Sequence, residues 1–324
     1  MIAKIPVPIP IEDIRAANTR IQGAAVRTPL IPFSNDASAA QIFLKPENLQ
    51  EIGSFKIRGA YNALAVANEI DLADGVYTAS AGNMAQGVAW TARRMNVQCE
   101  VIVPDHAPQT KLDAIRRLGG EIRKLPFDDW WQILIDHRCD GMKGKFVHPV
   151  SDRDVIAGNG TIGLEIIEDL PDVDTVIVPF GGGGLSCGIA SAIKAIKPDT
   201  KVIAVEVDTA CPLSAALKAG YPVKVDYKAS FVDGIGSRGV LADMWPLSQT
   251  VLDGVIVVSL EEVAAAIRLL AERNRLIAEG AGAAAIAACL TGRAGQGNIV
   301  CIVSGGNIDT RKLGRILERK NPDT

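Results

Sequence analysis

Four glycines in a row follow the apolar run DTVIVPF, and the segment from Leu185 onward has helical spacing of its apolar residues. Ordering a glycine costs more conformational entropy than ordering any other residue, so packing alone does not explain Gly181, Gly182, Gly183 and Gly184. Without Cβ atoms, their backbone N–H groups can turn toward one point in front of a helix N-terminus. We therefore expect this loop to bind an anionic group such as a phosphate.

The loop matches neither of two common phosphate motifs. No Lys-Ser or Lys-Thr pair follows the glycines, which excludes a P-loop. A flexible linker is the weaker interpretation, because these glycines lie between a continuous apolar strand and a helix. A dinucleotide site stays open as an alternative, since Glu206 lies at about the distance of a ribose-binding acid.

A lysine is the second candidate for chemistry. Lys56 follows Gly53, Ser54 and Phe55 and comes just before a helical pattern. An amine beside an aromatic ring at such a junction can lose enough solvent to act as a nucleophile. The alternative is an ordinary solvated lysine at a helix start, and the local sequence does not decide between the two.

Two polar turns complete the set. The segment SAGN at 80–83 joins a strand pattern to a helix pattern, where backbone N–H groups can bind a carboxylate and Asn83 can donate to a phenolate oxygen. A plain helix cap is the alternative for this segment. Ser304 ends the last strand pattern, where it either bonds a ring nitrogen or shapes a turn.

The elements that must position these side chains alternate between strand and helix. Helices are expected after Asn83, after Pro108 and after Ser259, the last with a capping box formed with Glu262. Strands are predicted at 41–45, 75–80, 99–104, 174–180, 201–207, 254–259 and 298–304. Most of these runs are continuously apolar, which indicates strands covered on both faces. The sequence therefore predicts an α/β fold with largely parallel, twisted sheets flanked by helices.

Composition excludes several classes of function. The chain has 324 residues, 48% of them hydrophobic, and a net charge of −3 with scattered Lys and Arg, so we expect no nucleic-acid partner. No apolar run reaches the length of a membrane helix, and the N-terminus lacks the apolar core of a signal peptide. The six cysteines form no Cys-x-x-Cys pair, which favours free thiols and a cytoplasmic location.

The four motifs together carry a resemblance that none of them carries alone. They closely resemble the serine/threonine dehydratase and serine racemase family, the fold type II pyridoxal-phosphate enzymes with a tryptophan synthase β-like fold. The likeness runs from about Thr28 to Ser304, nearly the whole chain. In order, the matching segments are SFKIRGA at 54–60, SAGN at 80–83, the glycines at 181–184 and SGGN at 304–307, with GNGTIGLEI at 158–166 and FVDGI at 231–235 adding to them.

The resemblance assigns roles by position. Lys56 would hold pyridoxal 5'-phosphate as a Schiff base and then act as general base at the substrate Cα, while Phe55 would pack beside the ring. The phosphate would be bound by Gly181, Gly182, Gly183, Gly184 and Leu185, and the other cofactor contacts would be Asn83, Gly234, Glu279 and Ser304. The substrate would be received by Ser80, Ala81, Gly82, Asn83 and Met84. The family architecture implies a large domain from 1–70 and 152–324 and a small mobile domain from 71–151.

The implied reaction is β-elimination. A dehydratase, or ammonia-lyase, would convert a β-hydroxy amino acid such as L-threonine or L-serine into a 2-oxo acid and ammonia. A neutral Ser304 at the ring nitrogen would keep that nitrogen unprotonated and favour rapid loss of the β-substituent. Little sequence follows this motif, so we expect a catabolic enzyme without a regulatory domain, and a homodimer by family analogy.

Other functions remain open at this stage. On the same cofactor they are racemisation and β-replacement. A protein that holds the cofactor without turnover is disfavoured by the set of Lys56, Asn83 and Ser304, and a nicotinamide dehydrogenase would use the glycine loop differently.

The chain departs from the family pattern in its substrate segment. Ala81 stands where family members that racemise serine carry a serine that protonates the opposite face of Cα, which favours dehydration. Met84 stands where dehydratases usually carry histidine. Together with Trp130 and Trp131 it suggests a bulkier or less polar substrate, although a core methionine and packing tryptophans are the simpler interpretation.

A second departure concerns the divalent cation of the family. Glu206 and Ala210 occupy two of its positions, but Pro212 stands where an aspartate is expected. We therefore predict no metal site and no strong metal dependence.

Overall fold

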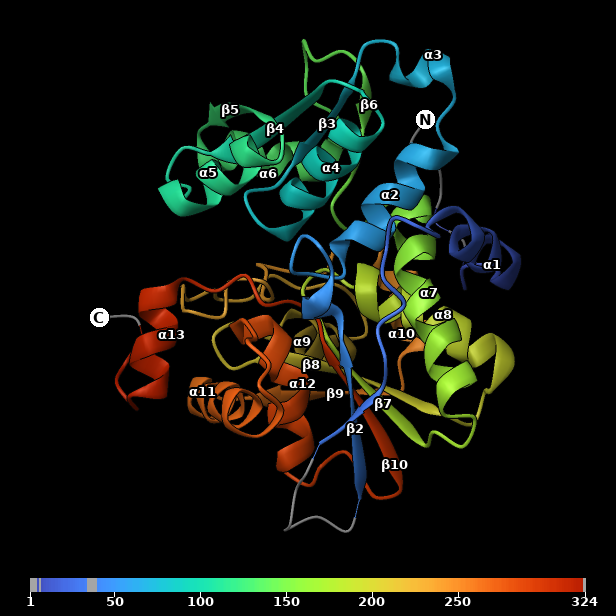
Figure 1. Cartoon of the computed structure of the whole chain (residues 1–324), viewed down its shortest axis with the longest axis vertical. Coiled ribbons are helices and arrows are strands. Elements are labelled where there is room, and N and C mark those ends of the chain that lie inside the picture. Colours follow the sequence, from blue (N-terminus) through green and yellow to red (C-terminus); the bar gives the residue numbers. More distant parts are fainter. Residues whose placement is uncertain (1–4, 6, 34–39, 323–324) are drawn as a thin grey trace.

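Two sheets, each with helices on both faces, make up the protein (Figure 1). The computed structural model describes residues 5, 7–33 and 40–322. The larger sheet has the order β1-β2-β10-β7-β8-β9, and only the β1–β2 pair is antiparallel. Its strands are β1 (Ile31–Pro32), β2 (Gln41–Pro46), β10 (Asn298–Val303), β7 (Thr175–Pro179), β8 (Lys201–Val207) and β9 (Gly254–Val258).

The smaller sheet comes from one continuous part of the chain. It has the order β5-β4-β3-β6, and all its pairs are parallel. The strands are β3 (Val76–Ala79), β4 (Cys99–Pro104), β5 (Glu121–Leu125) and β6 (Lys145–Phe146). The predicted α/β fold with largely parallel sheets is confirmed, whereas the domain limits at 70/71 and 151/152 stay a prediction.

Alternate residues of the central strands enter opposite cores. Val176 and Val178 face one core, and Ile177 between them faces the other, as the two-residue period of a strand requires. Helices α1 (Ile11–Arg20), α7 (Arg153–Asp169), α8 (Gly184–Ile196), α9 (Pro212–Ala219) and α10 (Trp245–Val251) cover the first face. Helices α11 (Leu260–Leu269), α12 (Gly280–Leu290) and α13 (Thr310–Leu317) cover the second face. Burial on both faces explains why these strands are continuously apolar.

The small sheet is covered in the same way by shorter helices. Helices α4 (Asn83–Arg94) and α5 (Gln109–Arg117) pack on one face and α6 (Phe127–Asp136) on the other. Helix α2 (Lys56–Val66) lies between the two parts and contacts both α4 and α7, and the short α3 (Glu69–Leu72) follows it.

The predicted helix starts are confirmed. Helix α4 begins at Asn83, Pro108 is the N-cap of α5, and Ser259 and Glu262 form the expected capping box of α11. All seven predicted strands are present within one or two residues of their expected ends.

Three strands were not predicted. β1 and β6 have two residues each, too few to produce a pattern. β5, with the sequence EIRKL, is an edge strand with half-buried and exposed side chains, so it lacks the apolar run that marked the others. Within residues 5, 7–33 and 40–322, no helix combines the length and apolar character needed to cross a membrane.

Candidate active site

The candidate site lies where several parallel strands end. β2, β10 and β7 are neighbours in the large sheet, and their carboxyl ends lead to Lys56, Ser304 and Gly181 respectively. Ligands of open α/β sheets bind at this edge, because the loops that follow the strands converge there. Residues from both ends of the chain therefore meet at one place.

Backbone hydrogen bonds fix Lys56 against the last strand. The N–H of Phe55 donates to the carbonyl of Ser304 at 3.0 Å, and the N–H of Gly306 donates to the carbonyl of Gly53 at 2.9 Å. Gly53 has a φ of +71°, a left-handed conformation that favours glycine. Lys56 is the first residue of α2, so its side chain starts from a rigid element.

The amine of Lys56 is enclosed. Its Nζ donates to the carbonyl of Pro149 at 2.6 Å and lies 5.2 Å from the centre of the Phe55 ring. Burial lowers the pKa of Lys56 to about 8, because an ammonium ion loses solvation there. At neutral pH an appreciable share of the amine is therefore unprotonated, as a nucleophile or base requires.

The glycine loop forms a cup before α8. Gly183 has a φ of +98°, and a Cβ placed on Gly182 would lie 2.5 Å from Cγ1 of Val150. Larger residues at these two positions would thus be strained or would clash. The loop ends at the N-terminus of α8, whose unpaired N–H groups attract an anion.

Asn83 is not a helix cap. The N-cap of α4 is Gly82, and no side chain caps that helix. Instead, Nδ2 of Asn83 donates to Oε1 of Glu279 at 2.8 Å, and Oδ1 accepts from Nδ2 of Asn307 at 2.8 Å. Burial, and next the negative charge of Asp233, raise the pKa of Glu279 to about 7. Asn83 thus joins the small sheet to the start of α12 across the site.

All the residues predicted for cofactor and substrate line one cavity of about 310 Å³. They are Phe55, Lys56, Ser80, Ala81, Gly82, Asn83, Met84, Gly181, Gly182, Gly183, Gly184, Leu185, Gly234, Glu279 and Ser304. The individual roles of these residues stay predictions. Their convergence on one cavity shows that the four motifs belong to a single site.

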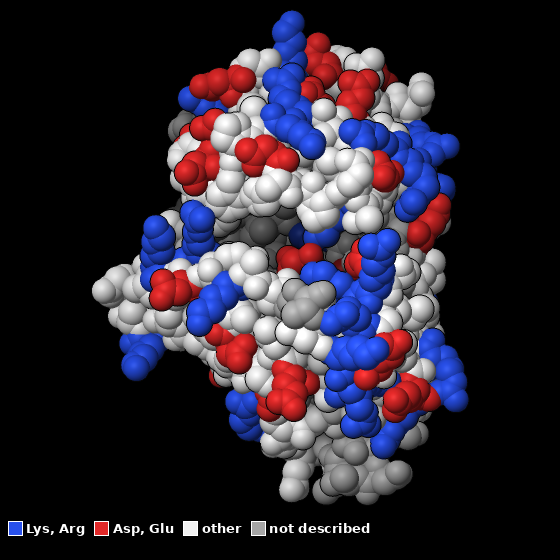
Figure 2. Space-filling model, turned by 90° about the vertical axis from the view of Figure 1, so that its left-hand side faces the viewer, with Lys and Arg blue, Asp and Glu red and all other residues white. Residues whose placement is uncertain are grey.

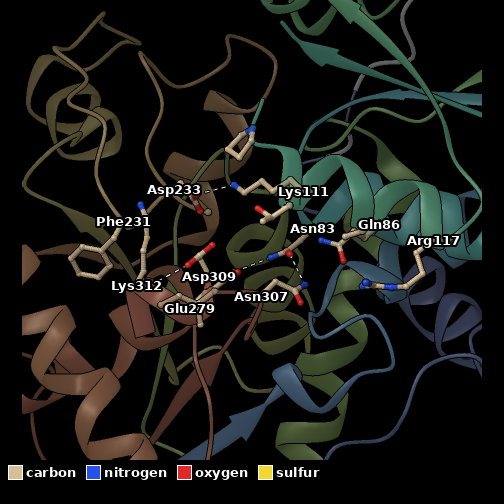
Figure 3. A pocket seen from close by; sticks show the side chains of 16 residues that line it. Asn83, Gln86, Lys111, Arg117, Phe231, Asp233, Glu279, Asn307, Asp309 and Lys312 are labelled. Carbon is tan, nitrogen blue, oxygen red and sulfur yellow. Dashed lines mark hydrogen bonds and ion pairs between the residues drawn. The ribbon is translucent and has the colours of Figure 1, made fainter. Parts of the chain in front are cut away.

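The mouth of this cavity is charged. A recess separates the two parts of the molecule, with acidic and basic side chains on its rim (Figure 2). An adjoining cavity of about 300 Å³ shares Asn83 and Glu279 with the first (Figure 3). Across it, Nζ of Lys111 on α5 forms an ion pair with Oδ2 of Asp233 at 2.7 Å, which links the small part to the large one.

Sequence reasoning overlooked some of the walls. Phe127 and Pro104 line the main cavity together with Trp130, whereas Trp131 faces an outer groove. No local signal separates the two tryptophans, since their helix decides which of them faces inward. Met84 is 1% exposed and belongs to the core of the small sheet, in agreement with the simpler interpretation of this residue.

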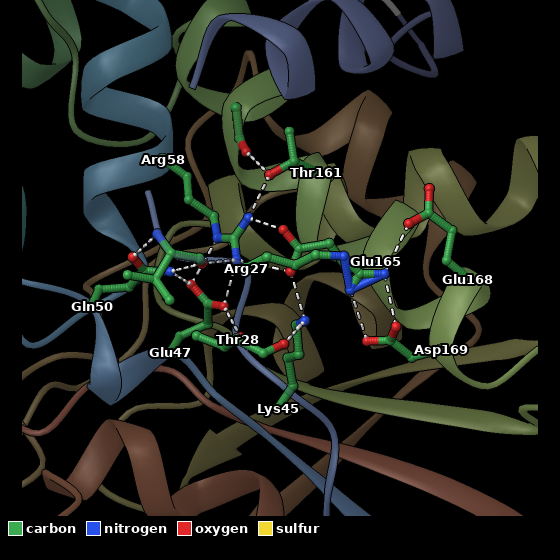
Figure 4. Close-up of polar contacts among 12 residues, drawn as sticks. Arg27, Thr28, Lys45, Glu47, Gln50, Arg58, Thr161, Glu165, Glu168 and Asp169 are labelled. Atoms are coloured by element: carbon green, nitrogen blue, oxygen red, sulfur yellow. Dashed lines mark hydrogen bonds and ion pairs between the residues drawn. The ribbon is translucent and has the colours of Figure 1, made fainter. Parts of the chain in front are cut away.

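A buried network of charges holds the start of α2 (Figure 4). Arg58 donates to Glu47 from Nε at 2.8 Å and from Nη2 at 2.9 Å, and to Glu165 of α7 from Nη1 at 2.6 Å and Nη2 at 2.9 Å. Nζ of Lys45 lies 2.6 Å from Oε2 of Glu165. Two cations thus neutralise two carboxylates that are almost fully buried. The network ties β2, α2 and α7 together beneath Lys56.

Glu206 does not serve as a ribose-binding acid. Its Oε1 accepts from the N–H of Leu213 at 2.6 Å and its Oε2 from the N–H of Ser214 at 2.9 Å, at the start of α9. The carboxylate is therefore committed to the fold, which removes the main support for a dinucleotide site. Among the described residues, no group of three or more His, Cys, Asp and Glu side chains could hold a metal ion. Independence from metal stays a prediction.

The comparisons with known proteins decide the family. The model of the family described as pyridoxal-phosphate dependent enzyme matches residues 21–305. The chain belongs to this family. It is 41% identical over 317 residues to an L-threonine ammonia-lyase of Thermotoga maritima, covering 96% of this chain and 79% of the relative. The catabolic L-threonine dehydratase TdcB of Escherichia coli is 38% identical over 320 residues, with 96% of each chain covered.

Solved structures agree with this membership. The crystal structure of serine racemase from Dictyostelium discoideum superposes with a TM-score of 0.83 at 33% identity, covering 93% of this chain and 99% of the other. The site also fits pyridoxal phosphate on its own geometry. The glycine cup would hold the phosphate, the amine of Lys56 would meet the aldehyde, and Phe55, Asn83 and Ser304 surround the space for the ring.

Proposed function

We propose that this pyridoxal-phosphate dependent enzyme is an ammonia-lyase that converts L-threonine, L-serine or a related β-hydroxy amino acid into a 2-oxo acid and ammonia. One observation carries the proposal. Lys56 lines the same cavity as the glycine cup and the N-terminus of α4, and burial lowers the pKa of its amine to about 8. The names of the relatives in Thermotoga maritima and Escherichia coli support the choice of substrate.

The residues of the chain divide the work between them. When bound, pyridoxal phosphate supplies an aldehyde that condenses with amines and a ring that withdraws the electron pair left at Cα. Gly181–Gly184 hold the phosphate, and the first turn of α4 holds the substrate carboxylate with its N–H groups. Lys56 takes the proton from Cα and returns it to the β-hydroxyl, which leaves as water. Hydrolysis of the enamine that remains then gives the 2-oxo acid and ammonia.

Ser304 sets the direction of this chemistry. It is 3% exposed at the end of β10 and lines the cavity, which supports our proposal that its hydroxyl would bond the ring nitrogen. A hydroxyl there would leave that nitrogen unprotonated, so the bound ring would withdraw electrons only weakly, which would favour elimination.

We further propose that dehydration dominates over racemisation. Ala81 lines the cavity but carries no proton to deliver to the opposite face of Cα. The test is to incubate the purified protein and pyridoxal phosphate with L-serine and L-threonine. We expect equal amounts of 2-oxo acid and ammonia, with little inversion of the recovered substrate. Recovered substrate that racemises faster than 2-oxo acid forms would refute the proposal.

A matched pair of variants separates the two outcomes. Ala81→Ser introduces a hydroxyl at the opposite face and should raise the rate of inversion. Ala81→Gly changes the size of the same side chain without adding a proton donor, so it should not. The ratio of inversion to 2-oxo acid formation is the quantity to compare, because it cancels any shared loss of activity.

We also propose that the side-chain pocket accepts a bulkier or less polar β-substituent than that of serine. Phe127 and Trp130 form an apolar wall with ring centres 5.6 Å apart, and Nε1 of Trp130 donates to the carbonyl of Ile102 at 3.1 Å. This bond fixes the indole, so the wall is preformed. Comparison of kcat/KM for serine, threonine and β-phenylserine tests the idea, and a clear preference for serine would refute it.

The remaining assignments belong to the same proposal. We propose a homodimer in the cytoplasm, with a small domain formed by residues 71–151 that moves relative to the rest. All six cysteines are free thiols, which suits a reducing compartment. Light scattering of the purified protein would measure the oligomeric state, and a monomeric mass would refute the dimer.

A further inference from the structure

The segment between β6 and α7 contacts both Lys56 and the glycine loop. The carbonyl of Pro149 accepts the hydrogen bond from Nζ of Lys56 at 2.6 Å. The next side chain, Val150, packs against Gly182 of the glycine cup. A small change in the path of this segment would therefore move the acceptor of Lys56 and the wall of the cup together.

The imidazole of His148 determines that path. Its Nδ1 accepts from the N–H of Val150 at 3.0 Å and from the N–H of Ser151 at 2.8 Å, which bends the chain around Pro149. Its Nε2 lies 3.0 Å from the carbonyl of Leu134 in α6. Because Nδ1 accepts two N–H groups, Nε2 carries the proton and donates it to Leu134. The ring thus joins the small sheet's helix to the segment beside Lys56.

The surroundings keep this ring neutral. His148 is 2% exposed and stacks on His137 with ring centres 4.3 Å apart. Burial, and next the neighbouring His137, lower the pKa of His148 to about 3. Oδ2 of Asp243 lies 3.0 Å from Nε2 of His137, so the nearest carboxylate is engaged with the other histidine. With its proton donated to a carbonyl and its lone pair occupied, His148 has no proton to exchange with a substrate.

We infer that His148 is a positioning residue. It holds the Pro149 carbonyl where it accepts the hydrogen bond from Lys56, and it links this position to α6. The inference rests on the proposed function only in that Lys56 is the reacting amine. A merely structural histidine would tolerate any replacement that fills the space. The inferred role instead needs an acceptor at the position of Nδ1.

Two replacements of similar polarity separate these possibilities. His148→Asn places an oxygen near the position of Nδ1 and can keep the bend. His148→Gln extends its amide toward Leu134 and leaves the N–H groups of Val150 and Ser151 without their acceptor. Ser151→Ala is the matched control, because it removes the hydroxyl that lies 3.2 Å from Nδ1 but leaves both N–H bonds to Nδ1 intact.

The first readout uses the chain without cofactor. Trace acetylation across pH 6–10, followed by peptide mass spectrometry, gives the titration midpoint of Lys56. We expect the titration midpoint of Lys56 in His148→Asn and Ser151→Ala to match that of the wild type. In His148→Gln the midpoint should fall by about half a pH unit or more, because the ammonium ion loses a hydrogen-bond acceptor. The second readout is kcat with cofactor, which should fall roughly tenfold or more in His148→Gln with little change in KM, as expected for a displaced catalytic group.

Failure is distinguishable from failure of the proposed function. If the Asn and Gln variants behave alike, whether both resemble the wild type or both are equally impaired, the inference is wrong, whatever reaction the wild type performs. Should His148→Gln not fold, the wild type itself decides. The chain has three histidines, so selective ¹⁵N labelling resolves their rings. We expect Nδ1 of His148 to stay unprotonated and Nε2 protonated from pH 5 to 9; a ring that titrates in this range would overturn the inference.

Discussion

Replacing Arg58 by methionine should destabilise the protein far more than replacing any surface arginine. Arg58 and Lys45 neutralise Glu47 and Glu165 in a network where Arg58 is 1% exposed and Glu47 is fully buried. Arg58→Met keeps an unbranched stem but removes the guanidinium, which leaves two buried carboxylates with one cation. Removing one partner of a buried ion pair costs about 3–5 kcal/mol, since the remaining charge cannot regain its solvation.

A control for this variant lies nearby on the surface. Arg27 pairs with Glu168 and Asp169, and its side chain is 48% exposed, so water replaces the lost partners in Arg27→Met. The expected loss there is about 0–1 kcal/mol. The double variant Arg58→Met with Glu47→Gln restores charge balance and should regain part of the loss, which distinguishes a charge effect from a packing effect.

Acid should weaken the contribution of Arg58. Burial opposes ionisation of Glu47, but the charge and hydrogen bonds of Arg58 outweigh it and hold the pKa of Glu47 below its ordinary value of 4.5. A carboxylate with a lowered pKa in the folded state stabilises the fold above its ordinary pKa, and this stabilisation is lost as the pH falls through the folded-state value. The difference in the free energy of unfolding between the wild type and Arg58→Met should therefore be largest at pH 7 and smaller in acid.

Urea unfolding of the cofactor-free chain, followed by circular dichroism, measures these differences. Comparable losses for Arg58→Met and Arg27→Met would refute the reasoning. A double variant less stable than Arg58→Met would also contradict it, because the charge imbalance would then not be the cause.

Three further predictions concern the site itself. Gly182→Ala should weaken binding of pyridoxal phosphate by roughly tenfold or more, because the added Cβ would clash with Val150. In Gly181→Ala the nearest atom to the added Cβ would lie 3.4 Å away, so this variant should bind the cofactor nearly as the wild type does. A fluorescence titration measures both affinities. Burial raises the pKa of Glu279 to about 7, so the folded state holds this proton more tightly than the unfolded state does, and the free energy of unfolding should fall as the pH rises from 4.5 to 7. Glu279→Gln should remove this pH dependence, which amounts to about 3 kcal/mol over that range, in unfolding measurements. Chelators should leave activity unchanged, because both oxygens of Glu206 bond the start of α9, and a loss restored by magnesium would contradict this.

Much of the site could be predicted because the residues that form it lie in short segments of the sequence. The glycines at 181–184 and the segment at 80–83 directly follow strands, and Lys56 begins a helix, so each of them lies at a boundary that the local pattern marks. β5 escaped prediction because an exposed edge strand needs no apolar run. The capping alternative for Asn83 was plausible locally, and only its partners Glu279 and Asn307 showed otherwise.

The sequence by itself determined the order of strands and helices and predicted an anion-binding loop at 181–184 and a reactive role for Lys56, because glycine runs and continuously apolar strands can be recognised in a sequence. The tertiary structure alone decided which groups surround that lysine. Pro149, its hydrogen-bond acceptor, lies 93 residues away, and Glu165, which anchors the start of its helix through Arg58, is more distant still. The physical reason is that a hydrogen bond between such segments depends on how sheets and helices pack together, and packing leaves no periodic signal in either segment.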